Sequence, residues 1–125
     1  IVSGEIPCSK VYEDDWSLAF LDIAPVHKGH ILVIPKNHYA NLEEIPGGEL
    51  QSLILIVKKC GLMLKEKLAC AGYNVSENND PVAGQEIPHL HFHLIPRLEG
   101  DGLASWRKEQ YLPGEMAAVL KKLTD

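Results

Sequence analysis

Short stretches of apolar residues separated by polar ones open the chain. The runs Lys10–Tyr12, Leu18–Ile23 and His30–Ile34 are typical of strands. Pro25 and Gly29 lie between the second and the third run and indicate a turn there. The first third of the chain therefore predicts an antiparallel meander of strands.

A helical pattern follows between two glycine-containing segments. From Glu49 to Ala69 apolar residues recur at the spacing of one helix face, with Gly47 and Gly48 before the stretch and Gly72 after it. These apolar positions are Leu50, Leu53, Ile54, Val57, Leu64 and Leu68. The pattern predicts one long helix that buries this face.

The last third of the chain returns to strands and ends in a second helix. We expect strands at Tyr73–Ser76 and at His89–Ile95, the latter closed by Pro96, and a polar loop at Glu77–Pro88 between them. The final helix is expected over Gly114–Leu123. Its inward-facing residues would be Met116, Val119, Leu120 and Leu123. This order predicts an α+β fold with a mainly antiparallel sheet, in a single domain over residues 1–125.

Size and composition agree with an ordinary folded domain. For a chain of 125 residues and 13.9 kDa, surface scaling predicts that roughly two thirds of the surface is buried on folding. A hydrophobic fraction of 46% with 23% charged residues excludes a disordered chain. The net charge of -5 repels a phosphate backbone, so we expect no nucleic-acid partner.

The apolar runs and the cysteines indicate in which cellular compartment the protein is found. The longest apolar runs, Ile31–Pro35 and Leu53–Val57, are far shorter than the ~20 residues that span a bilayer, and no signal-peptide pattern is visible. Cys8, Cys60 and Cys70 are odd in number and form no Cys-x-x-Cys pair, which argues against a disulfide framework. We expect a cytoplasmic protein with no membrane partner.

Three of the six histidines alternate with apolar residues in the run His89–Ile95. Side chains alternate along a strand, so His89, His91 and His93 are expected to share one face while the apolar residues between them join the core. Imidazole is the side chain best suited to proton transfer and ligation near neutral pH. The alternation therefore indicates a functional face.

Two kinds of chemistry fit three such imidazoles. Alternate residues are ~6.6 Å apart along a strand, so His89 and His93 would lie ~13 Å apart and a shared metal ion would need other ligands. Alternatively, the middle imidazole attacks a phosphorus atom while a neighbouring ring holds or protonates an oxygen.

The run His89–Ile95 resembles the signature of the histidine triad (HIT) hydrolases and transferases, in which three histidines alternate with apolar residues. Other matching segments are Leu18–Ile23, His30–Lys36, Asn78 and Gly84–Gln85. The resemblance runs from Gly4 to Arg97. It implies a HIT-like fold with a mainly antiparallel five-stranded sheet, one long helix and a C-terminal helix, and a homodimer joined through the long helix and a strand.

Details of the sequence narrow the resemblance. His93 stands where uridylyltransferase relatives have glutamine, while Ile95–Arg97 and Gly100–Gly102 with Trp106 look most like the small prokaryotic members. The implied function is cleavage of nucleoside 5′-monophosphate derivatives, such as phosphoramidates, at the α-phosphorus through a nucleotidyl-histidine intermediate. A dinucleoside polyphosphate hydrolase and a non-catalytic nucleotide-binding interaction protein are the alternatives.

The resemblance also implies catalytic roles. His91 would attack through Nε2, which requires its Nδ1 to carry the proton and donate to a backbone carbonyl. His93 would contact the phosphate and the bridging atom, with His89 and His30 in support. Glu86 stands where the eukaryotic phosphoramidase branch has a serine whose hydroxyl can assist the leaving group.

A nucleotide-binding set is implied in the same way. Its members are Phe20, Asp22, Ile23, Asn78, Gly84 and Gln85. Asp22 would accept hydrogen bonds from the ribose hydroxyls, Phe20 and Ile23 would flank a purine base, and the backbone around Gly84–Gln85 would donate to phosphate oxygens. Without the resemblance these residues are equally typical of turns and of core packing.

Catalysis of this kind requires no metal, but the resemblance allows a structural zinc ion. In many prokaryotic relatives a Cys-x-x-Cys, just upstream of the point where this chain starts, binds zinc with the counterparts of His38 and His89. These two histidines are therefore candidate ligands, and Cys8 is expected to be an ordinary thiol.

Overall fold

The computed structural model describes residues 8–103 and 106–125, so positions 4–7 of the segment matched above lie outside the described residues. In chain order its elements are β1 (Lys10–Glu13), β2 (Ser17–Leu21), β3 (Ile31–Pro35), α1 (Gly47–Lys67), β4 (Gly72–Glu77), a 3-10 turn η1 (Pro81–Ala83), β5 (Phe92–Arg97) and α2 (Glu115–Thr124). The predicted α+β class with a five-stranded antiparallel sheet is confirmed.

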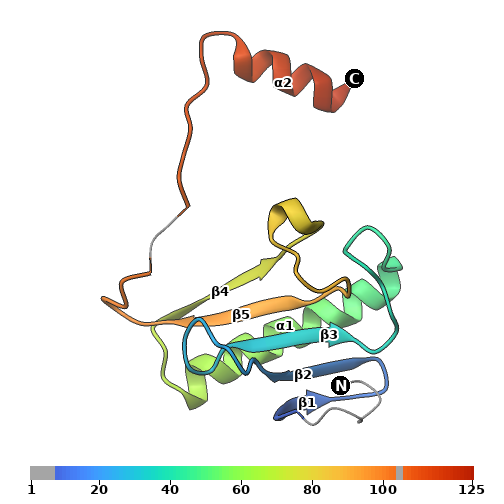
Figure 1. Cartoon of the computed structure of the whole chain (residues 1–125), viewed down its shortest axis with the longest axis vertical. Coiled ribbons are helices and arrows are strands. Elements are labelled where there is room, and N and C mark those ends of the chain that lie inside the picture. The colour runs from blue at the N-terminus through green and yellow to red at the C-terminus, as the bar shows by residue number, and fades with distance from the viewer. Residues whose placement is uncertain (1–7, 104–105) are drawn as a thin grey trace.

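The strand order places the last strand of the chain inside the sheet. The order is β1-β2-β3-β5-β4, and each neighbouring pair is antiparallel. Helix α1 connects β3 to β4 and covers one face of the sheet (Figure 1). Strand β5, which carries the end of the histidine run, is therefore flanked by β3 and β4.

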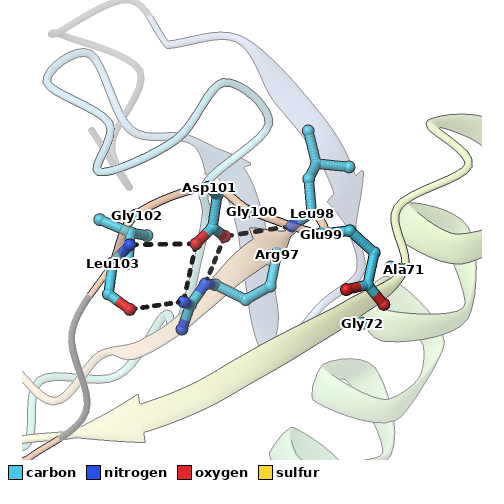
Figure 2. A pocket seen from close by; sticks show the side chains of 9 residues that line it. All are labelled: Ala71, Gly72, Arg97, Leu98, Glu99, Gly100, Asp101, Gly102 and Leu103. Carbon is cyan, nitrogen blue, oxygen red and sulfur yellow. Dashed lines mark hydrogen bonds and ion pairs between the residues drawn. The ribbon is translucent and has the colours of Figure 1, made fainter.

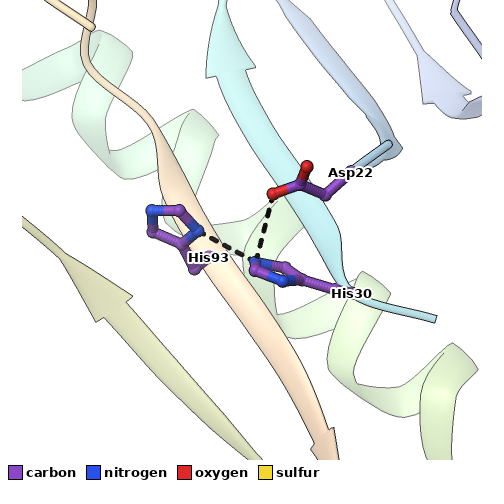
Figure 3. Close-up of side chains that lie close together, drawn as sticks. All are labelled: Asp22, His30 and His93. Atoms are coloured by element: carbon purple, nitrogen blue, oxygen red, sulfur yellow. Dashed lines mark hydrogen bonds and ion pairs between the residues drawn. The ribbon is translucent and has the colours of Figure 1, made fainter. Parts of the chain in front are cut away.

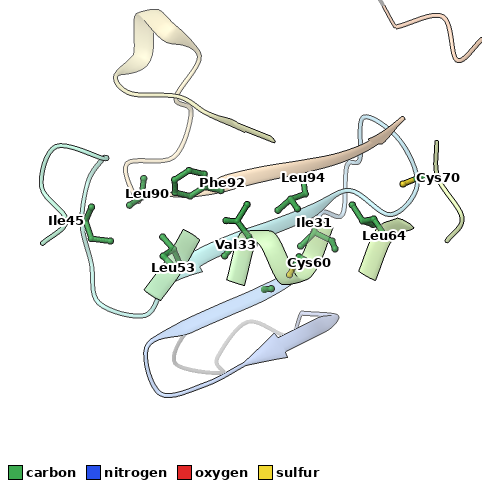
Figure 4. Close-up of a cluster of buried hydrophobic side chains, with 12 residues drawn as sticks. Ile31, Val33, Ile45, Leu53, Cys60, Leu64, Cys70, Leu90, Phe92 and Leu94 are labelled. Carbon is green, nitrogen blue, oxygen red and sulfur yellow. The ribbon is translucent and has the colours of Figure 1, made fainter. Parts of the chain in front are cut away.

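The main core lies between α1 and this face of the sheet (Figure 4). Its members include Ala19, Ile31, Val33, Leu53, Val57, Cys60, Leu64, Leu90, Phe92 and Leu94. The predicted inner face of the helix is confirmed for Leu53, Val57 and Leu64. It is wrong for Ile54 and Leu68, which are 45% and 56% exposed. Successive helix residues are about 100° apart, so Ile54 is turned away from the side that Leu53 buries.

The predicted strand His89–Ile95 is wrong at both ends. Strand β5 begins three residues later, at Phe92, and continues through Pro96 to Arg97. Proline removes a backbone donor and is normally excluded from a central strand. It is tolerated here because the pairing of β5 with β3 extends only to Leu94, so Pro96 lies beyond the point where both sides of β5 are paired.

Helix α2 forms close to the predicted range but is not packed as predicted. Met116, Val119, Leu120 and Leu123 were expected to face inward, yet they are 40–79% exposed. Figure 1 shows the physical reason, because α2 stands away from the sheet and from α1. Within the described ranges, no helix combines the length and apolar character that a membrane crossing requires.

Candidate active site

Strand pairing lines up one row of side chains across the face of the sheet that α1 does not cover. Phe20 pairs with Leu32, Leu32 with His93, and His93 with Ser76. Directly paired residues of antiparallel strands point to the same side. His93 therefore lies beside an apolar platform that contains Phe20 and Leu32, and a second buried cluster around Phe20 extends this platform over β2 and β3.

Asp22 follows β2 and His30 precedes β3, so the predicted strand Leu18–Ile23 runs two residues too far and the predicted strand His30–Ile34 begins one residue too early. The Asp22 N–H still donates to the His30 carbonyl at 2.9 Å. This bond holds the Asp22 carboxylate near the His30 ring, with Oδ2 3.9 Å from Nε2 (Figure 3).

His30 is buried and is bonded on both ring nitrogens. Its Nδ1 accepts from the Val26 backbone N–H at 3.1 Å, and its Nε2 lies 2.9 Å from His93 Nδ1. A neutral imidazole carries one N–H. Because Nδ1 accepts, that hydrogen is on Nε2 and is donated to His93. His93 Nδ1 is thus an acceptor, and the proton of its own neutral ring is on Nε2.

Both rings are held in the neutral form. Burial lowers the pKa of His30, while the Asp22 carboxylate acts in the opposite direction. Burial also lowers the pKa of His93 to about 4, and the neighbouring rings of His91 and His30 add to this effect. At neutral pH the pair therefore carries one proton on each ring.

His91 has the tautomer that attack through Nε2 requires. Its Nδ1 lies 2.8 Å from the His89 carbonyl and donates to it, which leaves the lone pair on Nε2. The ring centroid is 4.9 Å from that of His93. A nucleophilic nitrogen and a hydrogen-bond donor are thus adjacent.

His89 belongs to a different pair, so the expectation that the three rings line one strand face is wrong for it. It precedes β5, and its Nε2 donates to the Pro35 carbonyl at 2.9 Å. Its Nδ1 lies 3.1 Å from Nδ1 of His38. Burial lowers the pKa of His89, and the Pro35 carbonyl opposes this shift.

The cluster of His30, His93 and Asp22 and the pair of His38 and His89 differ in how well they could bind a metal ion. Ligand atoms of Asp22, His30 and His93 lie within 4.8 Å of one another. A metal on His30 Nε2 would move the ring proton to Nδ1, where the Val26 N–H already points, so this trio does not fit an ion. His89 instead donates Nε2–H to a carbonyl and turns Nδ1 toward His38, as a metal-bound histidine does.

The loop before the histidines is held by its own backbone. Gly84 adopts a left-handed φ of 94°, which glycine permits at little cost. The Gly84 N–H donates to the Pro81 carbonyl, and the Gln85 N–H donates to the Asp80 carbonyl. Asn78 approaches the same turn, with Nδ2 3.5 Å from the Gly84 carbonyl. Both amides expected to face phosphate are thus engaged within the loop.

Gln85 fixes this loop to the connection between β3 and α1. Its side chain is buried, and Nε2 donates to the carbonyls of Ala40 and Ile87 at 2.6 and 3.1 Å. Its Oε1 accepts from the Asp80 N–H at 2.8 Å. The side chain is therefore a structural brace for the residues that lead to the histidines.

Sequence reasoning missed two backbone groups of the site. The Val26 amide and the Pro35 carbonyl set the tautomers of His30 and His89, but no sequence pattern marks a backbone group. Phe20 is 8% exposed, as a platform residue should be, whereas Ile23 is fully exposed.

An open hollow of about 450 Å³ lies at the other end of β5 (Figure 2). Arg97 lines it, but its guanidinium already donates to the Asp101 carboxylate, to Asn74 Oδ1 and to the Leu103 carbonyl. Each of its three nitrogens is thus engaged, so the guanidinium closes the loop after β5 and contributes no donor to the histidine cluster.

Comparison with known proteins identifies the family of the chain. The model of the HIT domain family matches residues 3–100. A protein of Methanocaldococcus jannaschii described as HIT-like is 57% identical over 82% of this chain and 78% of its own length. The adenosine 5′-monophosphoramidase of Schizosaccharomyces pombe is 40% identical over 99% of this chain and 92% of its own length.

Solved structures share the fold. A HIT family protein from Bacillus anthracis superposes with a TM-score of 0.87 at 38% identity, over 98% of this chain and 90% of that one. A zinc-bound histidine triad family protein from Mycobacterium smegmatis superposes with a TM-score of 0.79 at 34% identity, over 87% of this chain and 79% of that one.

Proposed function

The chain belongs to the HIT domain family, and from this we propose that it hydrolyses nucleoside 5′-monophosphate derivatives, phosphoramidates among them, at the α-phosphorus. The observation that carries the proposal is the tautomer of His91, whose Nδ1–H is bound to the His89 carbonyl so that Nε2 presents a lone pair beside His93. The relative named adenosine 5′-monophosphoramidase supports the substrate class.

The proposed chemistry has two steps. His91 Nε2 attacks the α-phosphorus, a phosphorus–nitrogen bond forms, and the bond to the leaving group breaks. The positive charge that develops on the ring is stabilised through Nδ1–H by the His89 carbonyl. Water then attacks the nucleotidyl-histidine and releases the nucleoside monophosphate, while His93 Nε2–H donates a hydrogen bond to a phosphoryl oxygen in both steps.

The nucleoside is proposed to lie on the platform next to the histidines. Phe20 supplies a buried apolar surface, and the fully exposed Ile23 becomes covered when a purine base lies against it. Asp22 Oδ1 accepts from the Ala24 N–H, which leaves Oδ2 for a ribose hydroxyl. Asn78 and the Gly84–Gln85 loop border the phosphate.

Trapping the intermediate tests the mechanism. Alkaline quenching of a reaction with an adenosine phosphoramidate should yield one nucleotide bound per active site. His91→Ala should abolish both adduct and turnover, whereas His27→Ala, a histidine in the β2–β3 turn, should retain both. Turnover by His91→Ala, or net inversion at a chiral phosphorus, would mean direct attack by water.

The same experiment separates the alternative functions. A dinucleoside polyphosphate hydrolase would form the same adduct but prefer the polyphosphate in a comparison of kcat/KM. A protein that only binds nucleotides would form none.

We also propose a homodimer and a structural zinc ion. The dimer is supported by the exposed apolar residues of α2 and by β4, which is an edge strand of the sheet. In a chain that carries the upstream Cys-x-x-Cys, its two cysteines together with Nδ1 of His38 and of His89 would hold the ion, which would link the two connections that carry these histidines. A zinc-bound protein among the structural neighbours supports the choice of metal.

A further inference from the structure

A chain of hydrogen bonds runs in one direction from the backbone to the proposed reaction centre. The Val26 N–H donates to His30 Nδ1, and His30 Nε2–H donates to His93 Nδ1. His93 Nε2–H then points onward. A backbone amide does not give up its proton under these conditions, so the start of the chain cannot reverse.

This direction limits what His93 can give to a substrate. If His93 transferred its Nε2 proton, the ring would become an imidazolate unless His30 passed its own proton to Nδ1. His30 would then become the imidazolate, because the Val26 amide cannot replace that proton. A neutral imidazole is far too weak an acid for either outcome at neutral pH.

The neighbouring side chains supply no proton that could replace the one lost from His93 or His30. Asp22 Oδ2 lies 3.9 Å from His30 Nε2, and as a carboxylate it accepts protons rather than supplying them. Glu86 occupies an exposed position on the loop before the histidines, and a carboxylate there offers no hydrogen-bond donor.

We propose that His30 is a positioning residue which fixes His93 as a neutral hydrogen-bond donor, so that the proton of the leaving group comes from the substrate or from solvent and not from His93. This inference rests on the proposed function. An amine leaves after its nitrogen has been protonated by water, and a carboxylate, sulfate or phosphate leaves as an anion without a proton. An alkoxide would need a proton that the site does not hold.

Nitrogen NMR of the histidine rings tests the inference without turnover. At pH 7 the ¹⁵N spectrum of the wild-type chain should show His30 and His93 with the hydrogen on Nε2, and His91 with the hydrogen on Nδ1. A cationic His93, or His93 with its hydrogen on Nδ1, would overturn the proposal.

Two variants of one residue test the role of the backbone donor. Val26→Pro removes the N–H that His30 Nδ1 accepts, so His30 should populate the other tautomer and the His93 ring shifts should follow. Val26→Ala keeps that N–H and should leave both rings unchanged. The Val26 side chain is 54% exposed, so its loss removes little packing. Unchanged His30 shifts in a folded Val26→Pro variant would contradict the proposal.

A leaving-group series tests the chemical consequence. Single-turnover release of phenols of increasing pKa from nucleoside 5′-(aryl phosphates) should slow steeply with leaving-group pKa. His93→Ala should lower every rate by about the same factor, roughly 10²-fold for the lost hydrogen bond to the phosphoryl oxygen. A flat wild-type series, or a slope that steepens in His93→Ala, would show that His93 delivers the proton.

This outcome is distinct from failure of the proposed function. If no phenol is released and no His91 adduct forms, the function itself is wrong. If the His91 adduct forms but the dependence of the rate on leaving-group pKa differs from the expected one, the proposed function is retained and the role assigned to His93 is wrong.

Discussion

Asp22 lies where the apolar platform meets the histidine pair, and its two carboxylate oxygens have different surroundings. Oδ1 accepts from the Ala24 N–H at 2.9 Å, while Oδ2 faces His30 at 3.9 Å, too far for a hydrogen bond. Asp22→Ala should therefore weaken binding of ribonucleotides by about 10- to 100-fold, the value of a hydrogen bond to a charged group. Calorimetry with a 2′,3′-dideoxynucleotide is the control, and an equal loss for both ligands would contradict ribose recognition.

The neutral histidines predict how stability depends on pH. The pKa of His93 falls to about 4 in the folded chain because burial disfavours its charged form, against about 6.5 when unfolded. The unfolded chain thus binds more protons between these values, so the stabilisation is complete above pH 6.5 and is lost as the pH falls toward 4. His30 and His89 shift in the same direction.

Urea unfolding at pH 7 and pH 5 measures this effect. We expect the wild-type free energy of unfolding to fall by about 1–2 kcal/mol on account of His93, after allowance for solvent screening. His93→Gln should show a smaller fall than the wild type. An equal fall in both proteins would mean that His93 does not carry the shift.

At this scale the sequence and its resemblance predicted the tautomer of His91, but not the tautomers of His30 and His89 or the pairing of His30 with His93. The alternation of His89, His91 and His93 indicated an imidazole cluster. The tautomers of His30 and His89 depend on a backbone amide and a backbone carbonyl that come into place only when the chain folds. Such groups are present in almost every residue, so no residue type signals them.

The turn between β2 and β3 connects the helix to the site. Gly29, next to His30, has a φ of 98°, and a Cβ there would lie 2.7 Å from Leu68 Cδ1 near the end of α1. Gly29→Ala should cost about 1–3 kcal/mol in backbone strain, displace His30 and reduce kcat/KM. Gly102→Ala is the matched control, since its φ of 77° is strained but its Cβ would meet nothing within 4 Å. Denaturation and kinetics on both variants check this prediction, and equal catalytic losses would contradict it.

Two connections between elements meet at the proposed zinc ligands. His38 follows β3 and His89 precedes β5, so an ion held by both would cross-link segments 51 residues apart. In a protein that carries the upstream Cys-x-x-Cys, Zn²⁺ should raise the thermal midpoint because metal binding is coupled to folding, and His38→Ala should remove that increase. His27→Ala should retain it. A midpoint that Zn²⁺ raises equally in all three proteins would exclude the His38–His89 pair.

Element boundaries were predicted less well than element types, for a reason visible in β5. Its apolar alternation marks the strand, but where pairing begins and ends is decided by the neighbouring strands. Pro96 was expected to end the strand, yet β5 continues through Pro96 to Arg97. This is possible because the pairing of β3 with β5 already ends at Leu94, so Pro96 need not donate a hydrogen bond to β3. The residue pattern of one strand carries no information about how far the neighbouring strand extends.

At the scale of the whole molecule, the fold class followed from the sequence but the place of α2 did not. Amphipathic spacing predicts a buried face, and the main helix α1 satisfies it against the sheet. The spacing does not say which surface covers that face. For α2 the described chain supplies no cover, and a ten-residue helix alone is marginal in water. We therefore expect another protein surface to cover the apolar side of α2.

A pair of substitutions on α2 tests whether a second copy supplies that surface. Residue 120 lies on the apolar side with Val119 and Leu123, whereas residue 118 is about 160° away around the helix; both are exposed in the single chain. Leu120→Asp should shift the protein from two chains toward one in sedimentation equilibrium, because it places a charge in an apolar contact. Ala118→Asp adds the same charge to the same helix and should leave the mass unchanged. A wild-type protein that is already a monomer at high concentration, or equal masses for both variants, would exclude α2 from the dimer contact and leave the edge strand β4 as the surface to vary next.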